Sequence, residues 1–327
     1  MGGLTPDDRE AIERIASSIS FVSRDRAHIG GEGAGTEVDV AGPGGPVAGL
    51  AAALYGRFYC VPSASPAGQE GNPQAFLAGL RAANPIRPRL EGGWTIVQID
   101  QAGMLLSDAH GRQRRAAVQE VAPYGGGFAP GQPARIAVPR EMVTAPGGHY
   151  AILGRPVHEP RSGRQVRFYW NVAPEGAASF LTAVGAGLER RRIPFQAKVP
   201  VAPALYGRAD CGVLYLNLED IEASLDLIAG AFHTLRGSLR DETPLFTRRL
   251  APGLAFAESP PSGDSFGMHR CRLVAEGLLT AFDRGADDAD ARLRSVCDRF
   301  VGYGLDLAAL ERNPATCYPY RLESLAA

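Results

Sequence analysis

The chain has 327 residues, 45% of them hydrophobic and 21% charged, which is long enough for a sizeable core and too apolar for a disordered protein. Its formal net charge of −1 argues against non-specific binding to nucleic acid. The sequence contains no apolar run of membrane-spanning length and no signal peptide, so we expect a cytoplasmic protein without a membrane partner. Its five cysteines are scattered, which favours reduced thiols over a disulfide framework.

The first half of the chain is predicted to be mostly helical up to about residue 84. Thr5 and Pro6 suit an N-cap and a first helical position, and apolar residues at helical spacing continue to Ile19. Further helices are expected over 46–59 and 73–83, with loops over 30–46 and 61–73. The period then changes, and short strands are expected over 94–99, 103–107, 115–121 and 134–138.

The second half is predicted to contain a mixed or antiparallel sheet flanked by helices. The expected order is a strand over 165–172, a helix over 174–192, a strand around residue 198, a strand over 211–216, a helix over 218–236, a proline-containing connection over 243–263, and helices over 265–284 and 287–300. This order has no regular strand–helix alternation, which indicates an α+β fold. A boundary near residue 145 divides the expected regions 1–145 and 146–327.

Lys198 is the only lysine, because every other cation counted under Lys+Arg is an arginine. Arginine stays protonated in proteins, whereas lysine can give up its proton when it is desolvated or placed near other cations. The position therefore suggests a need for a cation that can act as a base. An accident of composition is the alternative explanation.

Familiar nucleophile, nucleotide and metal motifs are absent or incomplete. The run Gly263–Gly267 matches a Gly-x-Ser-x-Gly elbow, but Pro260 and Pro261 exclude a central strand before it, so Ser265 is predicted to be a helix N-cap. A P-loop is excluded because glycine does not precede the single lysine. No two histidines have metal-binding spacing, and we expect neither a metal nor another cofactor.

Arginines of the second half suggest a phosphate site. Several lie at strand ends or at a helix start beside apolar residues: Arg167, Arg208, Arg248, Arg249, Arg270 and Arg272. Guanidinium groups and helix N-termini bind phosphate dianions well. A lysine base beside arginines, without metal or nucleotide motifs, suggests β-elimination of phosphate from a phosphorylated serine or threonine.

These residues lie within runs that resemble the HopA-type effector family. The runs are Leu54–Tyr59, Arg167–Val172, Ile193–Val199, Tyr206–Asp210, Val213–Tyr215, Thr243–Thr247, Leu250–Gly253 and Ser265–Arg272. The resemblance covers most of residues 46–282. It implies either a type III secreted effector or a lyase of thioamitide or class V lanthipeptide biosynthesis. Such a lyase removes phosphate from a precursor peptide, beside a separate kinase-like protein, and leaves dehydroalanine or dehydrobutyrine.

A more distant similarity to bacterial phosphothreonine lyases suggests individual roles and a lyase-like core. By that comparison Lys198 is the base, and Arg167 and Arg208 bind phosphate. The position of the family's histidine acid is occupied by Tyr169, so either Tyr169 or His269 is the expected acid. The remaining arginines are expected to bind substrate, together with two residues of the matching runs, Asn171 and Tyr206.

The sequence is also compatible with a protein that has no catalytic activity. The same arginines would also suit a phosphopeptide-binding module or an effector-like protein that grips phosphate without eliminating it. The expected partners are a phosphorylated precursor peptide and a kinase-like protein. The N-terminal region would bind the leader peptide, bind the kinase or simply complete the core.

Overall fold

The computed structural model describes residues 3–30, 36–60, 71–144, 148–155, 164–286 and 288–325. The chain folds as two compact units, one made of residues 1–84 and 143–327 and the other of residues 85–142. The single boundary expected near residue 145 is thus replaced by two. The reason is that the N-terminal helices pack with the second half of the chain, while only the intervening segment folds apart.

The first unit is built around an antiparallel sheet with the strand order β14-β15-β11-β13-β12-β10. The strands are β10 (His149–Leu153), β11 (Gln165–Trp170), β12 (Phe195–Pro200), β13 (Gly212–Asn217), β14 (Arg248–Ala251) and β15 (Leu254–Glu258). After its first residue, β11 is buried throughout. A strand buried on both faces needs helices on both sides of the sheet.

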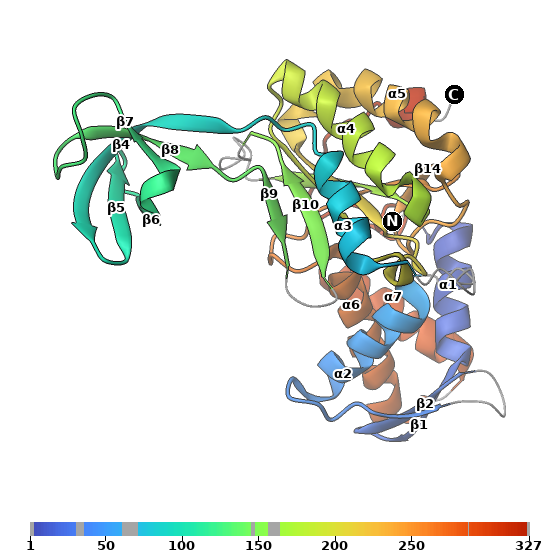
Figure 1. Cartoon of the computed structure of the whole chain (residues 1–327). Coiled ribbons are helices and arrows are strands. Elements are labelled where there is room, and N and C mark those ends of the chain that lie inside the picture. The colour runs from blue at the N-terminus through green and yellow to red at the C-terminus, as the bar shows by residue number, and fades with distance from the viewer. Residues whose placement is uncertain are drawn as a thin grey trace. The chain divides into compact units, whose positions relative to one another are not determined.

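One face of this sheet is covered by α4 (Ala177–Arg191) and α5 (Leu225–Leu235), which also pack against each other (Figure 1). The ring of Phe180 on α4 lies 5.7 Å from the indole of Trp170 on β11. Gly212 permits this approach, because a Cβ at that position would lie 3.1 Å from the Phe180 ring. The aromatic pair therefore fixes α4 against the centre of the sheet.

The opposite face is covered only in part. The helices on that side are α1 (Pro6–Ser17), α2 (Gly45–Leu54), α6 (Phe266–Asp283) and α7 (Ala289–Gly302). Ala255 and Ala257 of β15 share one core cluster with Tyr169 and residues of α6, and their small side chains let the helix lie close. Farther across the same face, Gln196 and Lys198 of β12 are only half-buried. The uncovered part of the sheet is where the predicted base lies.

The N-terminal segment adds a small sheet and a π-helical turn to this unit. The strands β1 (Ile19–Ser23), β2 (Arg26–Ile29) and β3 (Thr36–Asp39) form an antiparallel sheet in that order. After α2 the chain continues as the π-turn η1 (Tyr55–Tyr59), and α3 (Pro73–Ala82) comes later. Single π-turns are found often at functional sites. Here the turn stacks Tyr55 on Tyr59, with ring centroids 5.1 Å apart.

The second unit is a five-stranded antiparallel sheet with the order β6-β5-β4-β8-β7. Its strands are β4 (Arg89–Asp100), β5 (Gly103–Asp108), β6 (Gln113–Ala116), β7 (Val121–Pro123) and β8 (Pro133–Val138). It has a separate core made of Trp94, Ile96, Met104, Leu106, Ala116, Val121, Ala134 and Ile136. β9 (Glu141–Val143) follows where the chain leaves this unit. Short 3-10 turns lie at Val118–Glu120, Pro174–Gly176, Pro203–Leu205, Leu218–Asp220, Glu222–Ser224, Arg236–Ser238 and Leu322–Leu325.

The predicted α+β class is confirmed, and so are two predicted caps. The Thr5 hydroxyl accepts a hydrogen bond from the amide of Asp8, and the Ser265 hydroxyl accepts one from the amide of Met268. Each cap satisfies a backbone donor that has no partner within its helix. Across the described residues, no helix is both long and apolar enough to cross a membrane.

Several strands were not expected from the sequence. The segment 243–263, predicted as a connection, contains β14 and β15, and the strand 149–153 was missed entirely. β15 is short and buried along its whole length, and it follows Pro252 and Gly253, so it shows no alternation that would mark a strand. The expected strand 115–121 is instead the end of β6, a 3-10 turn and the start of β7.

The tight turn before β15 gives a test of this packing. We expect Gly253→Ala to lower the free energy of unfolding by about 3 kcal/mol, because Gly253 has φ +69° and an added Cβ would lie 2.2 Å from the carbonyl oxygen of Arg240. Gly285→Ala is the matched control, since φ is +67° there but the space is open, and it should cost about 1 kcal/mol. Urea titration compares them, and equal losses would contradict the proposed clash.

Candidate functional site

The half-covered face of the sheet gathers polar side chains from three neighbouring strands. The register pairs Arg167 of β11 with Tyr215 of β13, and Tyr215 with Gln196 of β12. Two residues along β12, Lys198 lies opposite Val213, which in turn lies opposite Tyr169. Because alternate residues of a strand point to the same face, all these side chains share one side of the sheet.

Lys198 lies beside an aromatic ring and near other cations. Its Nζ is 5.6 Å from the centroid of the Tyr215 ring, and Cζ of Arg167 is 5.3 Å from the same centroid. Within the described part of the chain, the amine has neither a hydrogen bond nor an ion pair. The Tyr215 ring therefore lies close to both the amine of Lys198 and the guanidinium of Arg167.

Arg208 belongs to a half-buried cluster that joins the π-turn to the loop before β13. Its Nε and Nη2 donate to the two carboxylate oxygens of Asp210 at 2.5 and 2.7 Å, and Nη2 also donates to the Tyr55 hydroxyl at 2.7 Å. Burial disfavours the charged guanidinium, but the ion pair with Asp210 outweighs this and raises the pKa of Arg208. The contacts orient Arg208 firmly and use part of its hydrogen-bonding capacity.

His149 is a member of the site that sequence reasoning did not select. It begins β10, where Ala151 pairs with Lys198, so His149 and Lys198 share a face and are diagonal neighbours. The pKa of His149 is lowered from 6.5 to about 4, first because the ring is partly buried and then because Lys198 and Arg208 are positively charged, whereas Asp210 opposes the effect. His149, Lys198, Arg208 and Asp210 are therefore close enough to influence one another.

Tyr169 is buried between the sheet and α6. Its ring lies 6.4 Å from that of Phe266, and Tyr59 lies at the same distance from Phe266. Burial raises the pKa of Tyr169 to about 12, although the nearby Arg167 lowers it in part. The hydroxyl is therefore protonated at neutral pH, next to Arg167.

The N-terminal half of α6 holds its basic residues in structural contacts. Arg270 is fully buried and donates to the carbonyl oxygens of Leu310 and Arg312 at 2.8 and 2.7 Å. Its Nη1 lies 2.7 Å from Nδ1 of His269, whose buried ring packs edge-on against Tyr303. Burial, followed by the charge of Arg270, lowers the pKa of His269 to about 4. These contacts tie the C-terminal segment to α6.

The other predicted arginines are spread over different surfaces. Arg272 forms an exposed ion pair with Asp264 at 3.0 Å. Arg248 pairs with Glu323 at 3.3 Å, and together with Arg249 it lines a cavity of about 680 Å³ that also includes Asp7. A different cavity lies beside Arg167, and the two cavities have no lining residue in common. The structure thus groups Arg167 and Arg208 around Lys198 and does not bring the other four to them.

Asn171 and Tyr206 are buried and bound to the backbone. Nδ2 of Asn171 donates to the carbonyl of Glu242 at 3.0 Å, and the Tyr206 hydroxyl donates to the carbonyl of Pro200 at 3.1 Å. Both contacts fix loops that border the sheet. A metal site is not evident, since no group of three or more His, Cys, Asp or Glu side chains among the described residues could hold an ion.

Comparison with known proteins decides the family. Residues 144–312, more than half of the chain, match the model of the HopA1 effector protein family. The chain belongs to this family. The effector protein from Pseudomonas syringae pv. tomato strain DC3000 is 20% identical, with a TM-score of 0.49 over 81% of this chain and 90% of that one. The effector protein from Pseudomonas syringae pv. syringae strain 61 is 17% identical, with a TM-score of 0.43 over 82% and 96%. No curated protein matches the chain.

The HopA1 family segment includes most of the site but not all of it. Lys198, Arg167, Arg208 and His149 lie within residues 144–312, whereas Tyr55 of the π-turn precedes them. His149 could have been found from the sequence only by predicting that Ala151, two residues later, pairs with Lys198 across neighbouring strands. That prediction depends on recognising β10, whose strand pattern was not identified.

The electrostatic link between His149 and Lys198 predicts a measurable change. Lys198→Met should raise the pKa of His149 from about 4 toward 6.5, because it removes a positive charge that disfavours the imidazolium. NMR titration of the His149 ring protons measures this. Arg249→Met, which removes an exposed cation lining the other cavity, should leave the titration unchanged. An unaltered pKa in Lys198→Met would contradict the arrangement.

The buried guanidinium of Arg270 predicts a large loss of stability. Arg270→Ala should lower the free energy of unfolding by about 3 kcal/mol or more, because it leaves two backbone carbonyls and His269 without their partner. Arg272→Ala should cost less than about 1 kcal/mol, since its ion pair is exposed. Denaturant titration compares the two variants, and similar small losses would show that Arg270 has no structural role.

Proposed function

We propose that this HopA1-family protein is a phospho-Ser/Thr lyase that acts on a peptide. The observation that carries the proposal is the environment of Lys198. It is the only lysine of the chain, half-buried, without an acidic partner in the described structure, and beside Tyr215 and Arg167. The charges of Lys198 and Arg208 both lower the pKa of His149, so Arg208 is a second arginine in the same surroundings.

The proposed reaction is a β-elimination. The neutral amine of Lys198 removes the proton from Cα of the phosphorylated residue, and the electrons of that C–H bond form the Cα=Cβ double bond. The bond between Cβ and the phosphate oxygen breaks, so inorganic phosphate leaves with its bridging oxygen. Arg167 and Arg208 stabilise the charge of the leaving group. The products are phosphate and dehydroalanine or dehydrobutyrine.

Protonation of the leaving oxygen requires an acid, and two residues suit this role. His149 is neutral in the free protein because of burial and the cations around it, and a bound phosphate dianion would favour its protonated form. Tyr169 keeps its proton at neutral pH and lies beside Arg167. His269, the other residue considered from the sequence, is fully buried against Arg270 and Tyr303, which makes it less suitable.

The family resemblance suggests the wider setting. We propose that the substrate is a precursor peptide of a ribosomally made thioamitide or lanthipeptide, phosphorylated by a separate kinase-like partner in the cytoplasm. No cofactor takes part in the proposed chemistry. An effector-like protein that only grips a phosphopeptide is the alternative, because Arg208 would also hold phosphate without a base.

The test is mass spectrometry of a phosphothreonine peptide incubated with the purified protein and EDTA. Elimination removes H3PO4 from the peptide, whereas hydrolysis removes only HPO3. We expect the first product, and we expect Lys198→Ala to slow its formation by at least about a thousandfold.

Lys198→Arg is the matched control. It keeps the positive charge and length but provides no base, so it should be as inactive as Lys198→Ala. Retained elimination in Lys198→Arg would mean that the residue acts only through its charge. Tight phosphopeptide binding by the unaltered protein, without any dehydroamino acid, would favour the binding module.

A further inference from the structure

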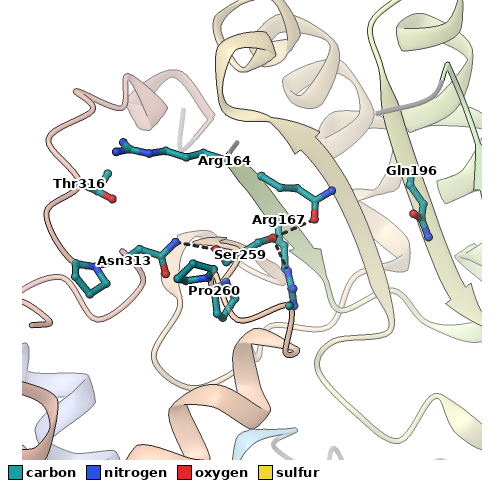
Figure 2. Close-up of a pocket in the computed structure, with 11 residues that line it drawn as sticks. Arg164, Arg167, Gln196, Ser259, Pro260, Asn313 and Thr316 are labelled. Carbon is teal, nitrogen blue, oxygen red and sulfur yellow. Dashed lines mark hydrogen bonds between the residues drawn. The ribbon is translucent and has the colours of Figure 1, made fainter. Parts of the chain in front are cut away.

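A cavity of about 650 Å³ lies next to Arg167 and Gln196, and Lys198 is not among its lining residues (Figure 2). Four segments wall it: the start of β11, Gln196 of β12, the loop after β15 and the C-terminal loop. The described residues lining it are Arg164, Gln165, Arg167, Gln196, Ser259, Pro260, Pro261, Gly263, Asn313, Pro314 and Thr316. None of them is acidic.

Hydrogen bonds hold the walls of this cavity in place. The Ser259 hydroxyl accepts a hydrogen bond from Nε of Arg167 at 2.9 Å (Figure 2). It donates to Oε1 of Gln165 at 3.2 Å. Beside it, the buried carboxylate of Glu258 accepts hydrogen bonds from the backbone N–H of Asn313 at 2.8 Å and from the Thr316 hydroxyl at 2.9 Å. The cavity is therefore largely formed before any ligand arrives, as most ligand sites are.

Two amide side chains of the lining have unused hydrogen-bonding groups. Nδ2 of Asn313 donates to the carbonyl of Ser259, but its Oδ1 is buried and has no partner among the described residues. The side-chain amide of Gln196 makes no hydrogen bond within the described structure, although it borders the cavity. A buried acceptor without a partner is unusual, and a ligand in the cavity that carries a hydrogen-bond donor would satisfy it.

This set of groups fits a peptide backbone better than a carboxylate. Oδ1 of Asn313 requires a donor such as a peptide N–H, while Gln196 and the guanidinium of Arg167 offer donors to a carbonyl oxygen. A carboxylate ligand would supply acceptors only and would leave Oδ1 unpaired. An apolar ligand would leave all of these groups unpaired.

The location fits the same ligand. Gln196 precedes Lys198 by two residues on the same face of β12, which corresponds to about 7 Å. An extended peptide advances about 3.3 Å per residue. A chain whose phosphorylated residue lies at Lys198 therefore reaches the cavity with the residue one or two positions away.

We propose that this cavity binds the main chain of the substrate peptide beside the phosphorylated residue, through Asn313 and Gln196, and so accepts varied side chains there. The inference rests on the proposed function for the position of the phosphorylated residue. It predicts a lyase that needs a peptide on at least one side of the phosphate but does not read its sequence at this point.

Binding measurements test the proposal without requiring turnover. A fluorescein-labelled peptide, Ala-Ala-phosphothreonine-Ala-Ala amide, is titrated with the full chain by fluorescence anisotropy, in competition with N-acetyl-phosphothreonine methylamide. We expect Asn313→Ala to weaken pentapeptide binding about tenfold and to leave binding of the blocked single residue unchanged. N-methylation of the peptide amide that enters the cavity should weaken binding to the unaltered protein but not to Asn313→Ala.

Gln196→Ala is the second variant, because the Gln196 side chain makes no hydrogen bond to the described residues and lies on β12, away from the C-terminal loop. Gln196→Ala should also weaken binding of the pentapeptide and leave binding of the blocked single residue unchanged. Equal affinity of both variants and the unaltered protein for the pentapeptide would overturn the proposal, as would equal losses for both ligands. If the unaltered protein binds without eliminating phosphate, the lyase fails while the Asn313 comparison still decides this inference.

Discussion

One aromatic ring separates the two cations on which the proposed site depends. Arg167 and Lys198 both lie within 6 Å of the centroid of Tyr215, and the described structure provides no carboxylate between them. Like charges repel, but the negative face of an aromatic ring tolerates a cation nearby without neutralising it. The result is a positive region that remains available for a phosphate dianion, with a spacing fixed by the sheet.

The two faces of the sheet explain why this region stays open. α4 and α5 bury one face through Phe180 and Trp170, whereas α6 reaches only part of the other, where Ala255 and Ala257 leave room for it. The polar residues of β12 lie beyond the helix. The same α6 also anchors the C-terminal segment through Arg270, and that segment in turn supplies Asn313 and Thr316 to the neighbouring cavity.

Much of the fold was predictable, and the site only in part. Helix caps at Thr5 and Ser265 and the strands with Arg167 and Lys198 have local signals, and they were found. β15 was missed because complete burial removes the alternation that marks a strand, and β10 because its pattern was not recognised. His149 became visible only through pairing with the Lys198 strand. Arg270 was predicted to bind phosphate from its position at a helix start. Its guanidinium instead donates hydrogen bonds to two backbone carbonyls.

The hydrogen bond between Tyr55 and Arg208 joins residues that are 153 positions apart in the sequence. Tyr55 precedes the inserted second unit in the chain, and Arg208 follows it. Closing so long a loop costs entropy that grows only with the logarithm of its length, and an insertion with its own core shortens the flexible part of that loop. During synthesis, the π-turn emerges well before its partner. The arginine can be oriented only after the intervening chain has left the ribosome, so this contact forms later than the local turns at either end of it.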